Sequence, residues 1–212
     1  MIDRERFIQA FLKGRIEEVK GLVQEALDAG ENPVSLLNQG LIKVMNQIGL
    51  LFKKGEIFIP EVLVAARAMH ACLSILKPVL SNTGSPRMEK VVLGTVKGDL
   101  HDIGKNLVGM MLEGGGFEVI DIGIDAPPEK FIKAVKDHEP KIVGLSALLT
   151  TTMTQMKVTI EALRGIRLGS QTRTIVGGAP VTEEFARQIG ADGYAPDAVM
   201  AVEKVRELIG LN

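Results

Sequence analysis

The 212-residue chain has a single cysteine and only three histidines. One thiol, Cys72, cannot form an internal disulfide, which excludes a disulfide-stapled fold and indicates a reducing compartment. We also find no apolar run that approaches the length of a membrane span. The N-terminus, MIDRERFIQAF, is charged from the start and lacks the apolar centre of a signal peptide. We therefore expect a cytoplasmic protein with no membrane partner.

An excess of charge of one sign is also lacking. The formal net charge is -1, and positive and negative side chains alternate along the chain. A nucleic-acid-binding surface normally shows a basic patch or stripe, so we expect no nucleic-acid partner. Hydrophobic residues make up 46% of the chain, which is ample for a packed core in one large domain or two small ones.

Residues 1 to about 80 carry the period of amphipathic helices. A first apolar series stops at Gly30, and Asn32 and Pro33 predict the N-cap and the first residue of the next helix. Pro60 can open a third helix, which is apolar around much of its circumference and must be buried on most sides. We expect a small bundle of about four helices. The first series consists of Phe7, Phe11, Ile16, Val19, Val23 and Leu27.

The pattern changes after residues 81–90, SNTGSPRMEK, whose polar composition with Gly84 and Pro86 predicts a linker. Short β-branched runs then alternate with amphipathic helices. This alternation predicts a doubly wound parallel sheet of order 2-1-3-4-5, covered by helices on both sides. The predicted strands are 91–96, 117–123, 141–148, 174–178 and 192–195, and the predicted helices are 104–113, 127–138, 152–165, 182–189 and 197–209.

Right-handed crossovers place every strand-to-helix loop of such a sheet on one edge, with the binding crevice between strands 1 and 3. The segments GDLHDIG (98–104) and SALLTTT (146–152) should therefore face each other. The first loop has neither G-x-G-x-x-G nor G-K-[ST], which disfavours a nucleotide. The strand ends also lack the clustered acids that a phospho-receiver needs.

His101 is the unusual residue of the first loop, because it stands between Asp99 and Asp102. Taken alone, it could be a surface imidazole, with Asp102 as an N-cap. Alternatively, Asp99 could hydrogen-bond one ring nitrogen and free the other as a metal ligand. Cys72 and the other two histidines are remote in the predicted fold, so no closed set of zinc ligands can be assembled. A lone histidine ligand suits a metal whose other positions are filled by a macrocycle.

The segment GDLHDIGKNLV (98–108) resembles the D-x-H-x-x-G motif of base-off/His-on cobalamin-binding domains. With GLSALLTTT (144–152) and VGGAPV (176–181), essentially the whole chain is similar to corrinoid proteins of methylamine, methanol or methoxyaromatic methyltransferase systems. It is also similar to the cobalamin-binding region of methionine synthase. The resemblance implies an N-terminal helical bundle cap, residues 1–85, followed by a five-stranded, flavodoxin/Rossmann-like cobalamin-binding α/β domain, residues 86–212.

The resemblance also implies a role for each matching residue. His101 is expected to be the lower axial ligand of cobalt, replacing the dimethylbenzimidazole of the cofactor. Asp99 would hold and polarise the imidazole, and Thr152, where methionine synthase often has serine, would complete a ligand–acid–hydroxyl relay. The further expected cofactor contacts are Gly98, Leu100, Asp102, Gly104, Ser146, Leu148, Thr150, Gly177, Gly178 and Ala198.

Several of these residues also have a purely structural interpretation. Phe52 and Ile59 match cap positions that shield the methyl group, but apolar residues at helical spacing are equally typical of a bundle core. The hydroxyls of Ser146, Thr150 and Thr152 could cap the following helix. The glycines at 177–178 could simply form a turn at a strand end.

The function that the resemblance implies is a corrinoid methyl carrier. A substrate-specific methyltransferase would load a methyl group onto cob(I)alamin. An acceptor-side methyltransferase, using tetrahydrofolate or coenzyme M, would remove it from methyl-cob(III)alamin, and a reductive activase would repair oxidised cobalamin. Two alternatives stay open. The cobalamin-binding subunit of an adenosylcobalamin-dependent mutase shares the motif but normally lacks the cap, and a cobalamin-sensing regulator usually adds a basic DNA-binding helix-turn-helix.

Overall fold

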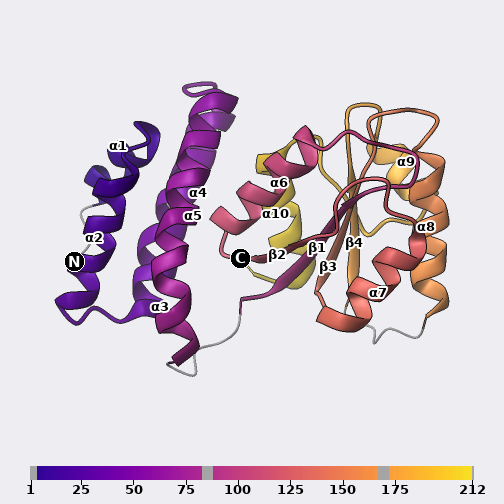
Figure 1. Ribbon diagram of the computed structural model, residues 1–212. Coiled ribbons are helices and arrows are strands. Elements are labelled where there is room, and N and C mark those ends of the chain that lie inside the picture. Colours follow the sequence, from indigo (N-terminus) through magenta and orange to yellow (C-terminus); the bar gives the residue numbers. More distant parts are fainter. Residues whose placement is uncertain (1–3, 83–87, 167–171, 212) are drawn as a thin grey trace. The chain divides into compact units, whose positions relative to one another are not determined.

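The computed structural model describes residues 4–82, 88–166 and 172–211 (Figure 1). Backbone contacts divide the chain into two compact units. The helical unit comprises Met1–Met88 together with Glu113–Gly116, and the α/β unit comprises Glu89–Leu112 together with Phe117–Asn212. Within the described ranges, all strands belong to the α/β unit.

The helical unit is built from short helices around the long helix α5. Its elements are α1 (Arg4–Leu12), α2 (Ile16–Asp28), α3 (Pro33–Ser35), the π-helical turn η1 (Leu36–Leu41), α4 (Ile42–Lys53) and α5 (Ile59–Asn82). Asn32 is the N-cap that the sequence predicts, since its side-chain oxygen accepts hydrogen bonds from the N–H groups of Val34 (2.9 Å) and Ser35 (3.1 Å).

The prediction of one continuous helical series up to Gly30 is wrong. The chain leaves α1 after Leu12 and enters α2 at Ile16, and Gly14 between them has a φ of +63°. Glycine adopts this left-handed conformation without steric cost, so it permits the turn. The apolar spacing continues through the break because both helices contribute to one core, for example with Phe11 and Val19, which are completely buried.

Helix α5 is more apolar than the sequence analysis allowed. Its segment Ile59–Leu80 has a mean hydropathy of 1.5 and is long enough to cross a membrane by length and composition, contrary to our expectation. However, 44% of this segment is buried inside the protein. Met69, Cys72 and Leu76 are completely buried, as in the core helix of a bundle. The hydropathy of α5 is thus accounted for by packing against α1, α2 and α4.

The α/β unit contains five parallel strands in the order β2-β1-β3-β4-β5, which confirms the predicted topology. Figure 1 shows α6 and α10 on one face of the sheet and α7, α8 and α9 on the other. The elements are β1 (Lys90–Thr95), α6 (Ile103–Gly114), β2 (Glu118–Asp121), α7 (Pro128–His138), β3 (Ile142–Ser146), α8 (Thr154–Gly165), β4 (Arg173–Gly177), α9 (Glu183–Gln188), β5 (Gly193–Tyr194) and α10 (Ala198–Ile209).

The predicted linker is shorter than expected, and the strand ends differ in detail. Helix α5 includes residues 81–82, β1 already begins at Lys90, and residues 83–87 lie outside the described ranges. β3 ends at Ser146 instead of 148, and α8 begins at Thr154 instead of 152. The reason is that the N–H groups of Leu148 and Leu149 donate to a side chain and not to a neighbouring strand.

The turn after β4 requires glycine, and this yields a first prediction. Gly178 has a φ of +134°, and a Cβ placed there would lie 1.9 Å from the carbonyl oxygen of Ala147. We expect Gly178→Ala to lower the free energy of unfolding by about 2 kcal/mol or more in urea denaturation. Gly165→Ala is the matched control in the same unit, because a Cβ at Gly165 meets no atom within 4 Å. Equal stabilities for the two variants would contradict the prediction.

Candidate cofactor-binding site

The centre of the candidate site is the carboxylate of Asp99, in the loop between β1 and α6. It is completely buried and accepts five hydrogen bonds. Its Oδ1 accepts from the backbone N–H of His101 (3.1 Å) and from ring atom Nδ1 (2.8 Å). Its Oδ2 accepts from the N–H groups of Leu148 (2.8 Å) and Leu149 (3.2 Å), and from Oγ1 of Thr152 (2.6 Å). This side chain therefore joins the two loops that were expected to face each other.

These contacts decide the charge of Asp99. Burial acts to raise its pKa, because the charged form loses its hydration. The hydrogen bonds from Thr152 and His101, together with those from the backbone N–H groups of Leu148 and His101, outweigh burial and hold the pKa well below its usual range. Asp99 is therefore ionised at neutral pH, and an ionised carboxylate can only accept hydrogen bonds.

The hydrogen bond with Asp99 fixes the tautomer of His101. Nδ1 must carry a proton, because its partner can only accept, so the lone pair of a neutral ring lies on Nε2. Among the described residues, Nε2 has no hydrogen-bond partner, and 49% of the side chain is exposed. The ring thus presents a nitrogen lone pair at the open edge of the sheet, as a metal ligand must.

Thr152 does not serve as a helix cap. Residue Met153 is the N-cap of α8, and no side-chain hydrogen bond caps the helix. The hydroxyl of Thr152 lies 2.6 Å from Asp99 Oδ2 and 2.9 Å from the carbonyl oxygen of Leu149, and its one proton favours the shorter contact with the charged acceptor. Ser146 and Thr150 make no side-chain hydrogen bond within the described ranges, so capping does not explain them either.

The glycines at this edge fall into two groups. A Cβ at Gly177 would lie 2.9 Å from the carbonyl oxygen of Ala195, and Gly178 faces Ala147. The close approach of the protein's own backbone therefore requires glycine at both positions, whatever else binds there. Gly104, in the first turn of α6, has ordinary backbone angles, and a Cβ there would point into open space. The fold does not require glycine at that position, which leaves room for a ligand.

Exposed apolar side chains lie in the two loops that Asp99 joins. The exposed fractions are 66% for Leu100, 85% for Ile103, 43% for Leu148 and 42% for Leu149. The hydrogen bonds of Asp99 hold the two loops that carry these residues together. Large apolar residues gathered at the open edge of a sheet mark a surface that an apolar ligand covers.

These features fit a metal that brings its own equatorial ring. Within the described part of the chain, no group of three or more His, Cys, Asp or Glu side chains could hold a metal ion. The described residues thus offer no closed set of ligands at this edge, whereas His101 offers one imidazole nitrogen. The apolar rim and the space at Gly104 suit a large planar ring better than a hydrated ion.

Two further residues of this region were missed by sequence reasoning. Asp125 accepts a hydrogen bond from the N–H of Gly98 (2.7 Å), and its own N–H donates to the carbonyl oxygen of Asp99 (3.0 Å). Lys105 is 5% exposed and forms an ion pair with Asp121 at the end of β2. The sequence held one indication of these contacts. Asp121 and Asp125 belong to the second predicted strand and the loop after it, and the predicted topology places that loop beside the first one.

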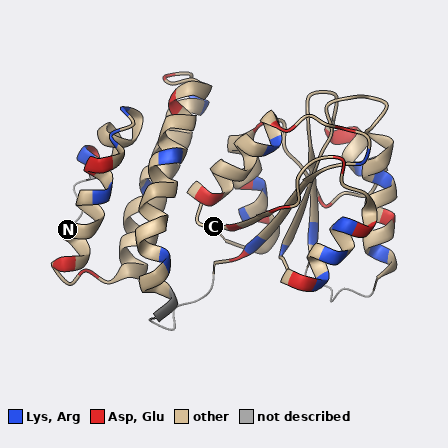
Figure 2. Ribbon diagram, viewed as in Figure 1, with Lys and Arg blue, Asp and Glu red and all other residues tan. Residues whose placement is uncertain are grey.

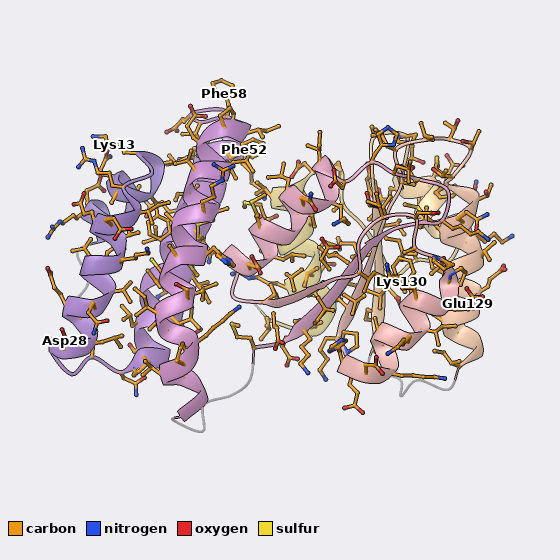
Figure 3. All side chains as sticks on the ribbon, in the orientation of Figure 1. Lys13, Asp28, Phe52, Phe58, Glu129 and Lys130 are labelled. Atoms are coloured by element: carbon orange, nitrogen blue, oxygen red, sulfur yellow. The ribbon has the colours of Figure 1, made fainter. Side chains whose placement is uncertain are left out.

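Three predicted residues lie outside the loops that follow β1, β3 and β4. Ala198 is the first residue of α10, after β5, and is 7% exposed. Phe52 and Ile59 belong to the helical unit, where Ile59 is 51% exposed, so bundle-core packing does not explain it. Figure 3 shows Phe52 and Phe58 at the end of this unit where α4 ends and α5 begins. Phe58, which the sequence analysis did not select, is 65% exposed.

The ionisation of Asp99 predicts how stability depends on pH. The pKa of Asp99 is lower in the folded protein than the value of about 3.9 for an unperturbed aspartate. Its contribution to the free energy of unfolding is therefore fully present above about pH 5 and is lost as the pH falls below about 4. We expect Asp99→Asn to lower the free energy of unfolding by about 2 kcal/mol at pH 7. The difference from wild type should shrink between about pH 5 and pH 2, measured by urea denaturation.

The exposed Asp102 provides the control for this experiment. Among the described residues its side chain accepts one hydrogen bond, from the amide of Asn106 (3.1 Å), so Asp102→Asn should lower the free energy of unfolding much less at pH 7. A difference between wild type and Asp99→Asn that stays constant down to pH 2 would show that the carboxylate charge is not the stabilising feature.

Comparisons with known proteins show the family of the chain. A family profile described as a B12 binding domain matches residues 89–203, and a second profile with the same description matches residues 3–77. A corrinoid protein from Desulfitobacterium hafniense is 40% identical over 205 residues, covering 95% of each chain. Dimethylamine corrinoid protein 2 from Methanosarcina mazei is 39% identical over 213 residues, covering 99% of this chain and 100% of that protein.

Solved structures give the same result. A cobalamin-binding protein from Desulfitobacterium hafniense has a TM-score of 0.81 at 33% identity, covering 99% of this chain and 100% of that one. A chain of the methanol:cobalamin methyltransferase complex from Methanosarcina barkeri has a TM-score of 0.83 at 31% identity, covering 97% of this chain and 79% of that one. The cofactor that fits the site is thus cobalamin, and the chain belongs to the family of corrinoid proteins with B12 binding domains.

Proposed function

We propose that this protein is a corrinoid methyl carrier with His101 as the protein ligand of cobalt. The observation that supports the proposal best is Nε2 of His101, which has no hydrogen-bond partner among the described residues and belongs to a half-exposed ring whose Nδ1 is held by the buried, ionised Asp99. The relatives named above include a dimethylamine corrinoid protein and a chain of a methanol:cobalamin methyltransferase complex. Both names favour a carrier that works with a methyltransferase.

The chemistry divides between the cofactor and the chain. Cobalamin, when bound, supplies a cobalt centre that accepts a methyl group and gives it up again. Asp99 accepts a hydrogen bond from the Nδ1–H of His101, which keeps Nε2 available and makes the imidazole a stronger ligand. Thr152 and the two backbone N–H groups donate to the other oxygen of Asp99, which keeps the shared proton on the ring.

The contact with Asp99 would serve His101 with and without the cofactor. The imidazole is half exposed, and its Nδ1 lies 2.8 Å from the ionised carboxylate. The buried carboxylate would therefore hold the ring in place before a metal binds Nε2 and after it leaves.

The remaining assignments extend the proposal over the chain. We assign residues 1–85 to a cap domain and 86–212 to the cobalamin-binding domain, with Phe52 and Ile59 shielding the upper face of the cofactor. A substrate-specific methyltransferase would load the methyl group, and an acceptor-side enzyme with tetrahydrofolate or coenzyme M would remove it. A reductive activase would serve the oxidised cofactor, and all components would be cytoplasmic. The proposed further cofactor contacts are Gly98, Leu100, Asp102, Gly104, Ser146, Leu148, Thr150, Gly177, Gly178 and Ala198.

Replacement of the ligand tests the coordination. We expect the wild-type protein loaded with hydroxocobalamin to show the visible spectrum of base-off, histidine-ligated cobalamin. His101→Ala should lose that signature and bind the cofactor at least about tenfold more weakly, since even outer-shell changes at metal sites cost that much. His138→Ala, at the end of α7, is the control and should leave spectrum and affinity unchanged. A histidine-ligated spectrum in His101→Ala would falsify the assignment.

A panel of partners tests the carrier function. We expect the reduced, cobalamin-loaded protein to be methylated by one of the methyltransferases for methylamines, methanol or methoxylated aromatics, as followed by visible spectroscopy. The rate should exceed that with free cobalamin, because the partner must recognise the protein. If no partner methylates the protein and adenosylcobalamin instead supports a mutase reaction, the carrier proposal is wrong.

A further inference from the structure

Thr95, the last residue of β1, contacts the backbone of the proposed ligand. Its side chain is completely buried, and its hydroxyl donates a hydrogen bond to the carbonyl oxygen of His101 at 2.9 Å. Its own backbone is fixed to the loop after β2: its N–H donates to Gly123 and its carbonyl oxygen accepts from Ala126, both at 2.9 Å. Thr95 is therefore a rigid support for the peptide that carries the imidazole.

The contact with Thr95 supplies a restraint that Asp99 cannot. Both hydrogen bonds between His101 and Asp99, from the backbone N–H and from Nδ1, end on the same oxygen, Oδ1. Two bonds that meet at one atom allow the residue some rotation about that atom. The third bond, at the carbonyl group, lies away from that atom and limits this rotation. It therefore restrains the peptide group from which the imidazole, and with it Nε2, extends.

The strand itself does not need this hydroxyl. Valine has the same branched shape as threonine and an equal or higher preference for strands, and β1 already contains Val91 and Val92. Within the described residues, the Thr95 hydroxyl donates its hydrogen bond to the carbonyl oxygen of His101. A buried hydroxyl is costly unless it is hydrogen-bonded, so the contact and the threonine depend on each other.

We propose that Thr95 is a positioning residue for His101, which fixes the direction in which Nε2 meets the metal; the metal-binding part of this statement rests on the proposed function. Thr95 does not touch the cofactor in this scheme. It acts through the carbonyl group of His101. Valine has nearly the same shape as threonine, so Thr95→Val removes this hydrogen bond and leaves the packing of the side chain nearly unchanged.

The test compares Thr95→Val and Thr95→Ser with wild type. We expect Thr95→Val to bind hydroxocobalamin about three- to tenfold more weakly, the loss of one net hydrogen bond, with a smaller histidine-ligated fraction in the visible spectrum. Thr95→Ser keeps the hydroxyl and should restore both values. Thr159→Val is the matched control, because Thr159 is equally buried and its hydroxyl donates to Gln155 at 2.8 Å within α8.

A double-mutant cycle separates positioning from general stability. If Thr95 acts through His101, Thr95→Val should cause no additional loss of cobalamin affinity in a His101→Ala background. An additional loss of the same size as in wild type would overturn the inference, because it would show that Thr95 acts through the fold.

The ligand-free protein provides a readout that does not depend on cobalamin. NMR relaxation of the His101 ring should show a more mobile imidazole in Thr95→Val than in wild type or Thr159→Val. A ring of wild-type rigidity in Thr95→Val would overturn the inference and leave the proposed function intact. A wild-type protein without histidine ligation would instead overturn the proposed function, and the ring dynamics would still decide whether Thr95 positions His101.

Discussion

The site depends on one buried negative charge, the carboxylate of Asp99. A buried ionised group is tolerated only when hydrogen bonds replace its hydration, and here five donors from two loops do so. The requirement to supply these donors shapes the local chain. The backbone after β3 turns its N–H groups toward the carboxylate, so the strand ends early and α8 begins late. This one carboxylate thus holds the two loops together and anchors the imidazole of His101 through Nδ1.

The sequence predicted the large features of the fold because they follow from periodic patterns. The strand order, the N-cap at Asn32 and the juxtaposition of the loops after β1 and β3 all follow from the spacing of apolar residues, helix signals and topology rules. The family followed from the D-x-H-x-x-G motif. By contrast, the break at Gly14 was missed, because the apolar series continues across it and only the backbone conformation reveals the turn.

The contacts of the site were harder to predict, for a different physical reason. Thr95 and Asp125 act through single hydrogen bonds between residues far apart in sequence, and such contacts leave no periodic signal. The glycines near Ala147 were expected to make room for the cofactor, yet the backbone of the protein already requires glycine at 178. Their contact with the cofactor therefore stays a prediction, as does the shielding role of Phe52 and Ile59.

The helical unit also bears on the two alternative functions. Residues 3–77 match a B12 binding domain profile of their own, whereas the small mutase subunits normally lack such a unit. In Figure 2, both basic and acidic segments are scattered over the helices of this unit and most of the ribbon is uncharged, unlike the basic helix-turn-helix of a regulator. Both observations favour the methyl carrier over its competitors.

The choice of threonine at position 152 has a consequence for the neighbouring loop. A β-branched side chain has fewer rotamers than serine, so the hydroxyl that faces Asp99 is aimed before the cofactor arrives. The branch methyl, Cγ2, lies 3.7 Å from the position that a Cβ at Gly98 would occupy. A methyl group at position 98 would meet Cγ2 at ordinary van der Waals distance, so the φ of +82° at Gly98, and not the contact with Thr152, is what favours glycine there. The loop that carries His101 thus begins with a left-handed turn packed beside the side chain that supports Asp99.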